Sequence, residues 1–105
     1  MINEEILLKN GYKEYKVPAY SFANKFFQKK VVDDKGIKYF IDFFCYDETD
    51  TYECRVQFEL KTFYYMNITR FGFDFDTTLE ELELRADNLW KTQDCRYYET
   101  EDMDG

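Results

Sequence analysis

The sequence contains no histidine, and this absence excludes more chemistry than any residue that is present. Without an imidazole, the chain lacks the usual general base at neutral pH and the commonest metal ligand, and no Ser-His or Cys-His nucleophile can form. Serine occurs once, as Ser21, and the four glycines follow no phosphate-loop spacing. We therefore predict a protein that is not an enzyme and uses no cofactor.

Carboxylates are the groups that remain for metal binding or acid-base catalysis. Asp74 and Asp76 alternate in "FDFDTT", and Asp47, Glu48 and Asp50 crowd one loop. Neither group has the spacing of a calcium loop, and acids are common before helices and in turns. We therefore predict no metal site.

Long hydrophobic runs and paired cysteines are also missing. No stretch approaches the roughly 18 apolar residues of a membrane span, and "MINEEILLKNGY" lacks the basic and apolar regions of a signal peptide. Cys45, Cys54 and Cys95 are odd in number and form no C-x-x-C pair. We expect a cytoplasmic protein with reduced, buried thiols and no membrane partner.

Aromatic residues and unevenly placed charges are what the sequence has in excess. Among 105 residues there are 11 Phe, 10 Tyr and one Trp, and large rings suit half-buried sheets and contact surfaces. Residues 1–73 are neutral, so the net charge of −8 arises in residues 74–105. Chain length indicates one domain, predicted over residues 1–98, and residues 99–105 are predicted to form a disordered acidic tail.

The pattern of elements predicts an α+β domain. A short helix is expected over residues 3–10, then four strands in a largely antiparallel meander, and a C-terminal helix over residues 79–91, with both helices on one face of the sheet. "YKEYKVPAYSF" is expected to be an irregular connection along the sheet edge. The fourth strand is expected over residues 64–70, with Tyr64, Met66 and Ile68 facing inward, and a short edge strand is expected over residues 96–98.

The hairpin formed by residues 37–60 is the most specific structural prediction. Pairing Tyr46 with Thr51 aligns one apolar face, in which Cys45 meets Tyr52, Phe43 meets Cys54, Ile41 meets Val56, Tyr39 meets Phe58 and Ile37 meets Leu60. The opposite face then places Asp42 beside Arg55, an oppositely charged pair that the apolar pattern did not require. The register of the preceding hairpin stays open, because pairing Val32 with Ile37 turns Lys30 and Gln28 towards apolar neighbours.

The C-terminal helix is predicted from its cap and its apolar stripe. Thr78 and Glu81 make a capping box. The apolar side chains that fall on one side are those of Leu79, Leu82, Ala86, Leu89 and Trp90. Leu84 is the exception on the far side.

Three surfaces are candidates for binding a partner. The first is acidic and would imitate a phosphate backbone for a protein with a basic surface; it comprises Glu80, Glu83, Asp87, Glu99, Glu101 and Asp102. The second is an aromatic face, which is covered by the N-terminal segment or binds a partner or a second copy of the chain; it comprises Phe40, Phe44 and Tyr46. The third is interleaved with tyrosines and would bind a nucleotide or nucleic acid; it comprises Lys13, Lys16, Lys25, Lys29 and Lys30.

The segments "NGYKEY", "FFQKKVVDDKGIKYFIDFFCYD", "NIT", "TLEELE" and "LW…CRYYE" together give a resemblance to a family. The chain resembles small uncharacterised proteins encoded by phages and prophages of low-GC Gram-positive bacteria. The resemblance implies a bacterial host cytoplasm and, by analogy, the anti-defence class that includes anti-CRISPR proteins. The leading hypothesis is a non-catalytic inhibitor that binds a host nucleic-acid-handling protein through its acidic surface. The alternatives are a nucleotide or nucleic-acid binding module and a homo-oligomeric scaffold.

Overall fold

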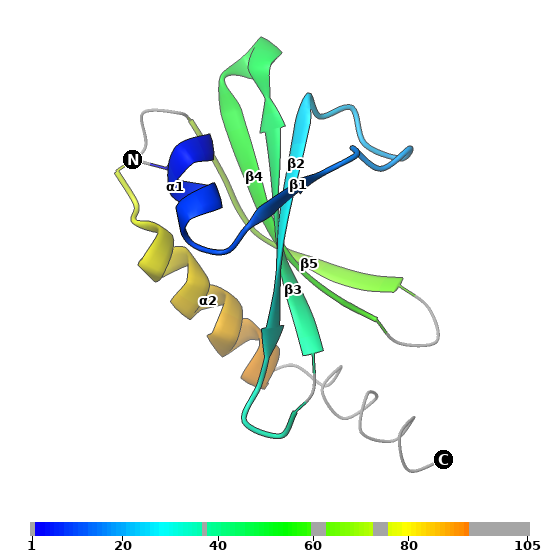
Figure 1. The fold of residues 1–105 in the computed structure, drawn as a ribbon, viewed down its shortest axis with the longest axis vertical. Helices are drawn as coiled ribbons and strands as arrows, with labels where there is room; N and C mark the ends of the chain where they lie inside the picture. Colours follow the sequence, from blue (N-terminus) through cyan, green and yellow to red (C-terminus); the bar gives the residue numbers. More distant parts are fainter. Residues whose placement is uncertain (1, 37, 60–62, 73–75, 93–105) are drawn as a thin grey trace.

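A computed structural model describes residues 2–36, 38–59, 63–72 and 76–92, which form one five-stranded antiparallel sheet with two helices (Figure 1). The strands lie in chain order, so each strand pairs with its neighbour in sequence. The elements are α1 (Glu4–Lys9), β1 (Lys13–Tyr15), β2 (Lys25–Val32), β3 (Lys38–Tyr46), the 3-10 turn η1 (Asp47–Thr49), β4 (Thr51–Glu59), β5 (Phe63–Gly72) and α2 (Leu79–Thr92). The α+β class is confirmed, but the predicted number of four strands is wrong.

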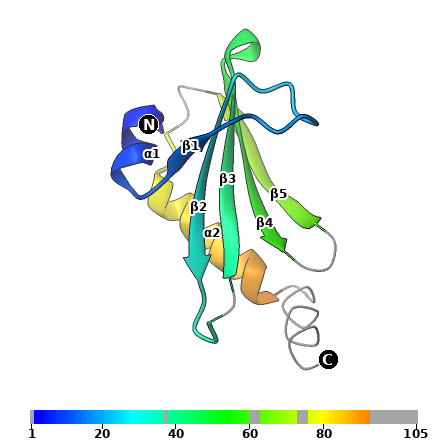
Figure 2. The ribbon, with the colours of Figure 1, turned by 45° about the vertical axis from the view of Figure 1, so that its right-hand side comes forward.

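Both helices lie on the same side of the sheet, and the connection between β1 and β2 projects from the other side (Figures 1 and 2). The core forms between the helices and the sheet. Its largest fully buried side chains on this side are those of Leu7, Tyr12, Phe27, Tyr39, Ile41, Phe43, Val56, Leu82 and Trp90. Within the described residues, the opposite side of the sheet carries no helix, and we term it the bare face.

The β3–β4 hairpin has the predicted register. Tyr46 pairs with Thr51, and the pairing continues without a shift to Ile41 and Val56. Asp50 closes the four-residue loop in the left-handed region, with φ of 49°, which Asp and Asn tolerate better than most residues. The predicted pair of Ile37 and Leu60 lies outside the described residues.

The β2–β3 hairpin resolves the register that the sequence left open. Val32 pairs with Lys38, one residue beyond the pairing tested from the sequence, so Gln28 and Lys30 lie on the bare face opposite Asp42 and Phe40. The turn is held by Asp33, whose Oδ1 accepts a hydrogen bond from the Lys35 backbone N–H over 2.8 Å. Tyr39 and Ile41, which the other pairing would set opposite Lys30 and Gln28, lie on the helix side of β3 instead.

β1 is the strand that the sequence prediction missed. It is only three residues long and fully exposed, and it pairs with β2 at the sheet edge, where an irregular connection was expected. A strand of three exposed residues shows no apolar alternation, which is the pattern from which strands are recognised in a sequence. Gly11 permits the sharp turn from α1 into this strand because its φ is 90°.

The Thr78 half of the predicted capping box and the apolar stripe of α2 are present. Thr78 Oγ1 accepts a hydrogen bond from the Glu81 N–H over 3.2 Å, and the helix extends to Thr92, one residue past the predicted end. Trp90 stacks on Tyr39 with 5.2 Å between ring centroids, and its Nε1 donates to Asp33 Oδ2 over 2.8 Å. The carboxyl end of α2 is therefore attached both to the sheet and to the β2–β3 turn.

β5 is longer than predicted and contains an irregularity opposite Cys54 and Arg55. Ile68, at this irregularity, packs against the core as expected. The inward orientation predicted for Tyr64 and Met66, the edge strand over residues 96–98 and the acidic tail all fall outside what the structure describes. Within the described residues, no helix is long and apolar enough to cross a membrane.

Candidate functional site

The bare face of the sheet brings charged and aromatic side chains together. Because side chains alternate along a strand, each strand contributes every second residue to this face. The register places on it Lys13 and Tyr15 from β1, Phe26, Gln28 and Lys30 from β2, Phe40, Asp42, Phe44 and Tyr46 from β3, and Glu53 and Arg55 from β4. The predicted aromatic face and part of the predicted lysine surface are thus one surface.

A polar pocket spans β1, β2 and β3 on this face. It has a volume of about 340 Å³, near the lower end of the range for small-molecule sites. Its lining consists of Gly11, Lys13, Tyr15, Gln28, Lys30 and Phe40. The pocket depends on β1, because this short strand carries Lys13 and Tyr15 alongside β2.

Beyond the pocket, the aromatic residues of the bare face are partly covered by the chain's own side chains. Phe44 is 0% exposed, because Phe26 stacks on it at 4.8 Å and the Arg55 guanidinium lies 4.6 Å from its ring centroid. Tyr46 is half-buried and lies under the Arg70 guanidinium at 4.8 Å. Of the three predicted aromatic residues, only Phe40 lines the pocket, and it is half-buried.

Asp42 is the unusual group of the bare face, because it is a carboxylate with 0% exposure. Its Oδ1 accepts a hydrogen bond from Gln28 Nε2 over 2.9 Å, whereas Oδ2 accepts none within the described part of the chain. Burial raises the pKa of Asp42 to about 7, although the Gln28 hydrogen bond and the Arg55 charge both act to lower it. Asp42 therefore exchanges its proton close to neutral pH.

The five predicted nucleotide-binding lysines divide between the two sides of the sheet. Lys13 and Lys30 line the pocket, and Lys16 follows β1 as an exposed residue. Lys25 and Lys29 lie on the helix side, where Lys25 pairs with Glu4 at 2.7 Å and Lys29 pairs with a carboxylate of α2. Adjacent residues of a strand point to opposite faces, so Lys29 and Lys30 cannot serve one site.

The predicted acidic row on α2 already has partners within the chain. Glu83 accepts hydrogen bonds from Lys29 at 2.8 Å and from Tyr12 Oη at 3.3 Å. Asp87 pairs with Lys91 at 2.9 Å and lies 3.4 Å from Tyr39 Oη. Burial, and after it the facing carboxylates, hold the pKa values of both tyrosines well above their usual range. Glu80 is exposed, and Glu99, Glu101 and Asp102 lie outside the described residues.

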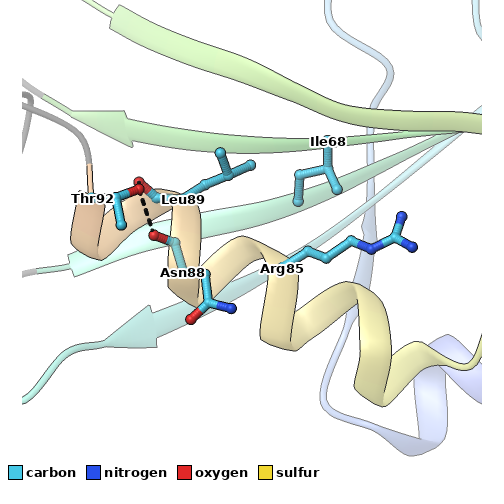
Figure 3. A pocket seen from close by; sticks show the side chains of 5 residues that line it. All are labelled: Ile68, Arg85, Asn88, Leu89 and Thr92. Atoms are coloured by element: carbon cyan, nitrogen blue, oxygen red, sulfur yellow. Dashed lines mark hydrogen bonds between the residues drawn. The ribbon is translucent and has the colours of Figure 1, made fainter.

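A second pocket of about 330 Å³ lies between α2 and β5 (Figure 3). Leu89 and Ile68 form its apolar part, and Arg85, Asn88 and Thr92 surround them. Thr92 Oγ1 donates to the Asn88 carbonyl oxygen over 2.8 Å, so its hydroxyl is used within the helix. This pocket has fewer available polar groups than the one on the bare face.

The described thiols are protonated at neutral pH, and the described carboxylates form no cluster of metal ligands. Cys45 and Cys54 are buried and unpaired with each other, and burial raises the pKa of Cys45 to about 11 and that of Cys54 further. A thiol that stays protonated is a poor nucleophile. Among the described residues, no three His, Cys, Asp or Glu side chains gather as metal ligands would. Cys95 and Asp74 lie outside this part of the chain.

Sequence reasoning did not identify Gln28, Asp42 or Arg55 as candidate site residues. One signal was available: Asp42 is the only acid between Ile37 and Tyr46, a stretch otherwise rich in aromatic and aliphatic residues. Comparisons with protein-family models, with curated proteins and with solved structures find no match for this chain. The functional argument therefore depends on the geometry of the bare face.

Proposed function

We propose that the chain is a non-catalytic binding protein whose bare face binds a nucleotide, either free or as part of a single strand of nucleic acid. The observation that carries this proposal is the convergence of Lys13, Lys30 and two aromatic rings on one polar pocket. Ammonium groups bind phosphate oxygens, and rings stack on bases irrespective of sequence. The amide of Gln28 adds a group that can form hydrogen bonds with a base edge.

The distribution of charge supports an anionic ligand despite the net charge of −8. Within the described residues, the acids of α1 and α2 lie on the helix side, where Glu4 and Glu83 pair with Lys25 and Lys29. The bare face keeps Lys13 and Lys30 at its pocket. Salt screens exposed charges over about 8 Å at physiological ionic strength, so the local lysines outweigh acids on the far side of the molecule.

The loop between β1 and β2 supports a longer ligand that extends beyond the pocket. This loop projects on the side of the sheet away from the helices (Figure 2). It carries Phe22, which is 97% exposed. An exposed ring on the loop that follows the strand carrying Lys13 and Tyr15 can stack on a second base.

The test compares single-lysine variants in binding to nucleoside monophosphates and to short single-stranded oligonucleotides. One charge-assisted hydrogen bond is worth about 1.5–3 kcal/mol. Lys13→Ala and Lys30→Ala should therefore each raise Kd by ~10-fold or more. Lys9→Ala is the matched control, because Lys9 pairs with Glu5 on α1 and is not among the residues that line the pocket.

Phe22→Ala distinguishes a free nucleotide from a single strand of nucleic acid as the ligand. This variant should weaken the binding of an oligonucleotide by ~10-fold and leave the Kd of a mononucleotide unchanged, because one stacked base is worth about 1–3 kcal/mol. The proposal is rejected if no nucleotide or oligonucleotide raises the melting temperature of the wild-type protein. It is also rejected if Lys9→Ala weakens binding as much as Lys13→Ala does.

The phage-type inhibitor that binds a basic host protein is a second proposal, supported by the acidic excess of residues 74–105. Because Glu83 and Asp87 hold internal contacts, reversing their charges would disturb the fold as well as the surface. Glu80→Lys is the cleaner test, since Glu80 is exposed. If the acidic surface binds a basic partner, this variant should slow association with that partner, and the effect should shrink as salt rises.

A homo-oligomer formed through Phe40, Phe44 and Tyr46 is the remaining proposal. Phe44 is buried beneath Arg55, so a Phe44→Asp variant would test folding and not assembly. Tyr15, which is 49% exposed on the same face, is the better site. If copies associate through this face, Tyr15→Asp should lower the mass measured by light scattering.

A further inference from the structure

Gln28 connects the pocket on the bare face to the buried carboxyl group of Asp42. Its side chain lines the pocket beside Lys13 and Lys30, and its Nε2 donates to Asp42 Oδ1 over 2.9 Å. Within the described residues, no hydrogen bond reaches Oε1 of Gln28. One end of the amide is therefore committed to Asp42, and its oxygen is available to a ligand.

The protonation state of Asp42 decides which end of the amide is committed. An ionised carboxylate can only accept hydrogen bonds, so it holds the NH₂ group of Gln28 and leaves the amide oxygen for the pocket. A protonated carboxyl group can donate its O–H to that oxygen. The amide then turns over and offers its NH₂ group to the ligand.

We infer that Asp42 is a positioning residue whose proton sets whether Gln28 presents an acceptor or a donor to the base of a bound nucleotide. This inference depends on the proposed nucleotide site and states which bases that site prefers. With Asp42 ionised, the pocket favours a base with an exocyclic amino group. With Asp42 protonated, it favours a base with a carbonyl group at the same position.

The groups around Asp42 place this exchange in an accessible pH range. Arg55 of β4 lies opposite Asp42 in the strand register, and Glu53 forms an ion pair with Arg55. β2 and β1 contribute Lys30 and Lys13 to the same face, whereas the helices lie on the other side of the sheet. Burial outweighs the attraction of Arg55 and brings the pKa of Asp42 to about 7.

The test uses cytidine and uridine monophosphates, which carry an amino group and a carbonyl group at the same ring position. Their phosphates titrate identically near pH 6, so the ratio of the two Kd values removes the effect of phosphate charge. The ratio should favour cytidine at pH 8.5 and shift by ~10-fold towards uridine at pH 5.5, since one exchanged hydrogen bond is worth about 1.4 kcal/mol. Asp42→Asn should make the ratio independent of pH. Lys30→Ala should weaken both ligands and leave the pH shift of the ratio intact.

A measurement without ligand separates this inference from the proposed function. In the wild-type protein, the side-chain amide NMR signals of Gln28 should titrate with a midpoint near pH 7, and in Asp42→Asn they should not. Constant Gln28 signals between pH 5.5 and 8.5 would overturn the inference whether or not nucleotides bind. If both nucleotides bind through Lys13 and Lys30 with a constant Kd ratio, the inference fails and the proposed function stands. If the Gln28 signals titrate but no nucleotide binds, the proposed function and the ligand preference fail together.

Discussion

Replacing Asp42 with Asn should remove one contribution to folding stability that is lost as pH rises. The carboxyl group of Asp42 is 0% exposed, and its pKa rises from 3.8 to about 7 because burial disfavours the charged form. Asn has nearly the same shape and carries no charge. The substitution therefore removes the ionisation and keeps an oxygen that can accept the Gln28 hydrogen bond.

The sign and size of the effect follow from proton linkage. Between pH 3.8 and about 7, the folded state holds a proton on Asp42 that the unfolded state has released, so stability falls as pH rises through this range. At about 1.4 kcal/mol for each pKa unit, the loss is ~4 kcal/mol above pH 7. Domains are usually stable by only about 5–15 kcal/mol, so the loss is easily measured.

The assay is urea unfolding of the wild-type protein and the Asp42→Asn variant at several pH values between 4 and 8.5, followed by the fluorescence of the buried Trp90. The difference in unfolding free energy should move by ~4 kcal/mol in favour of the variant as pH rises, because other titrating groups cancel. Asp50→Asn is the control, since it removes an exposed carboxylate and Asn tolerates the positive φ of that position. A constant difference for Asp42→Asn, or one that moves towards the wild type, would refute the reasoning.

Three further substitutions test the contacts of the helix side, each by denaturant unfolding at pH 7. Trp90→Phe removes the indole N–H that donates to Asp33 Oδ2 together with one of the two fused rings, and should cost about 1–3 kcal/mol, whereas Trp90→Tyr offers a hydroxyl donor for comparison. Thr78→Ala removes the α2 cap and should cost about 1 kcal/mol, and Thr78→Ser should recover most of it. Lys29→Met and Glu83→Gln should show a coupling of about 1 kcal/mol in a double-mutant cycle, which 1 M salt reduces; zero coupling at low salt would mean that the 2.8 Å pair adds nothing.

The sequence predicted the β3–β4 hairpin because two independent patterns agreed on one register. The apolar alternation and the opposition of Asp42 to Arg55 each require Tyr46 to pair with Thr51. The β2–β3 register stayed open because β2 has no apolar alternation: Phe26 and Phe27, Lys29 and Lys30, and Val31 and Val32 are each neighbours of the same type. Pattern arguments succeed where apolar alternation marks one face as the buried one and fail where that alternation is absent.

The candidate site was predicted only in part, because it depends on a strand that leaves no apolar pattern. Lys13 and Lys30 were among the predicted lysines, but only the pairing of β1 with β2 brings them to one pocket. The alternation of side chains along a strand would place Lys29 and Lys30 on opposite faces from the sequence alone. The sequence indicated that the outward aromatic face of β3 is covered or binds a partner, but the burial of Asp42 beside Gln28 depends on the β2–β3 register, which the sequence left open.

Asp33 couples the local opening of two segments that lie far apart in the sequence. One of its carboxylate oxygens holds the β2–β3 turn through Lys35, and the other holds the indole of Trp90 at the end of α2. Loosening either segment releases a contact of the other, which makes the hairpin tip and the helix terminus a single cooperative unit. The amide hydrogen-exchange rates of the β2–β3 turn and of the end of α2 should therefore rise and fall together, although 57 positions of sequence separate the bonded residues.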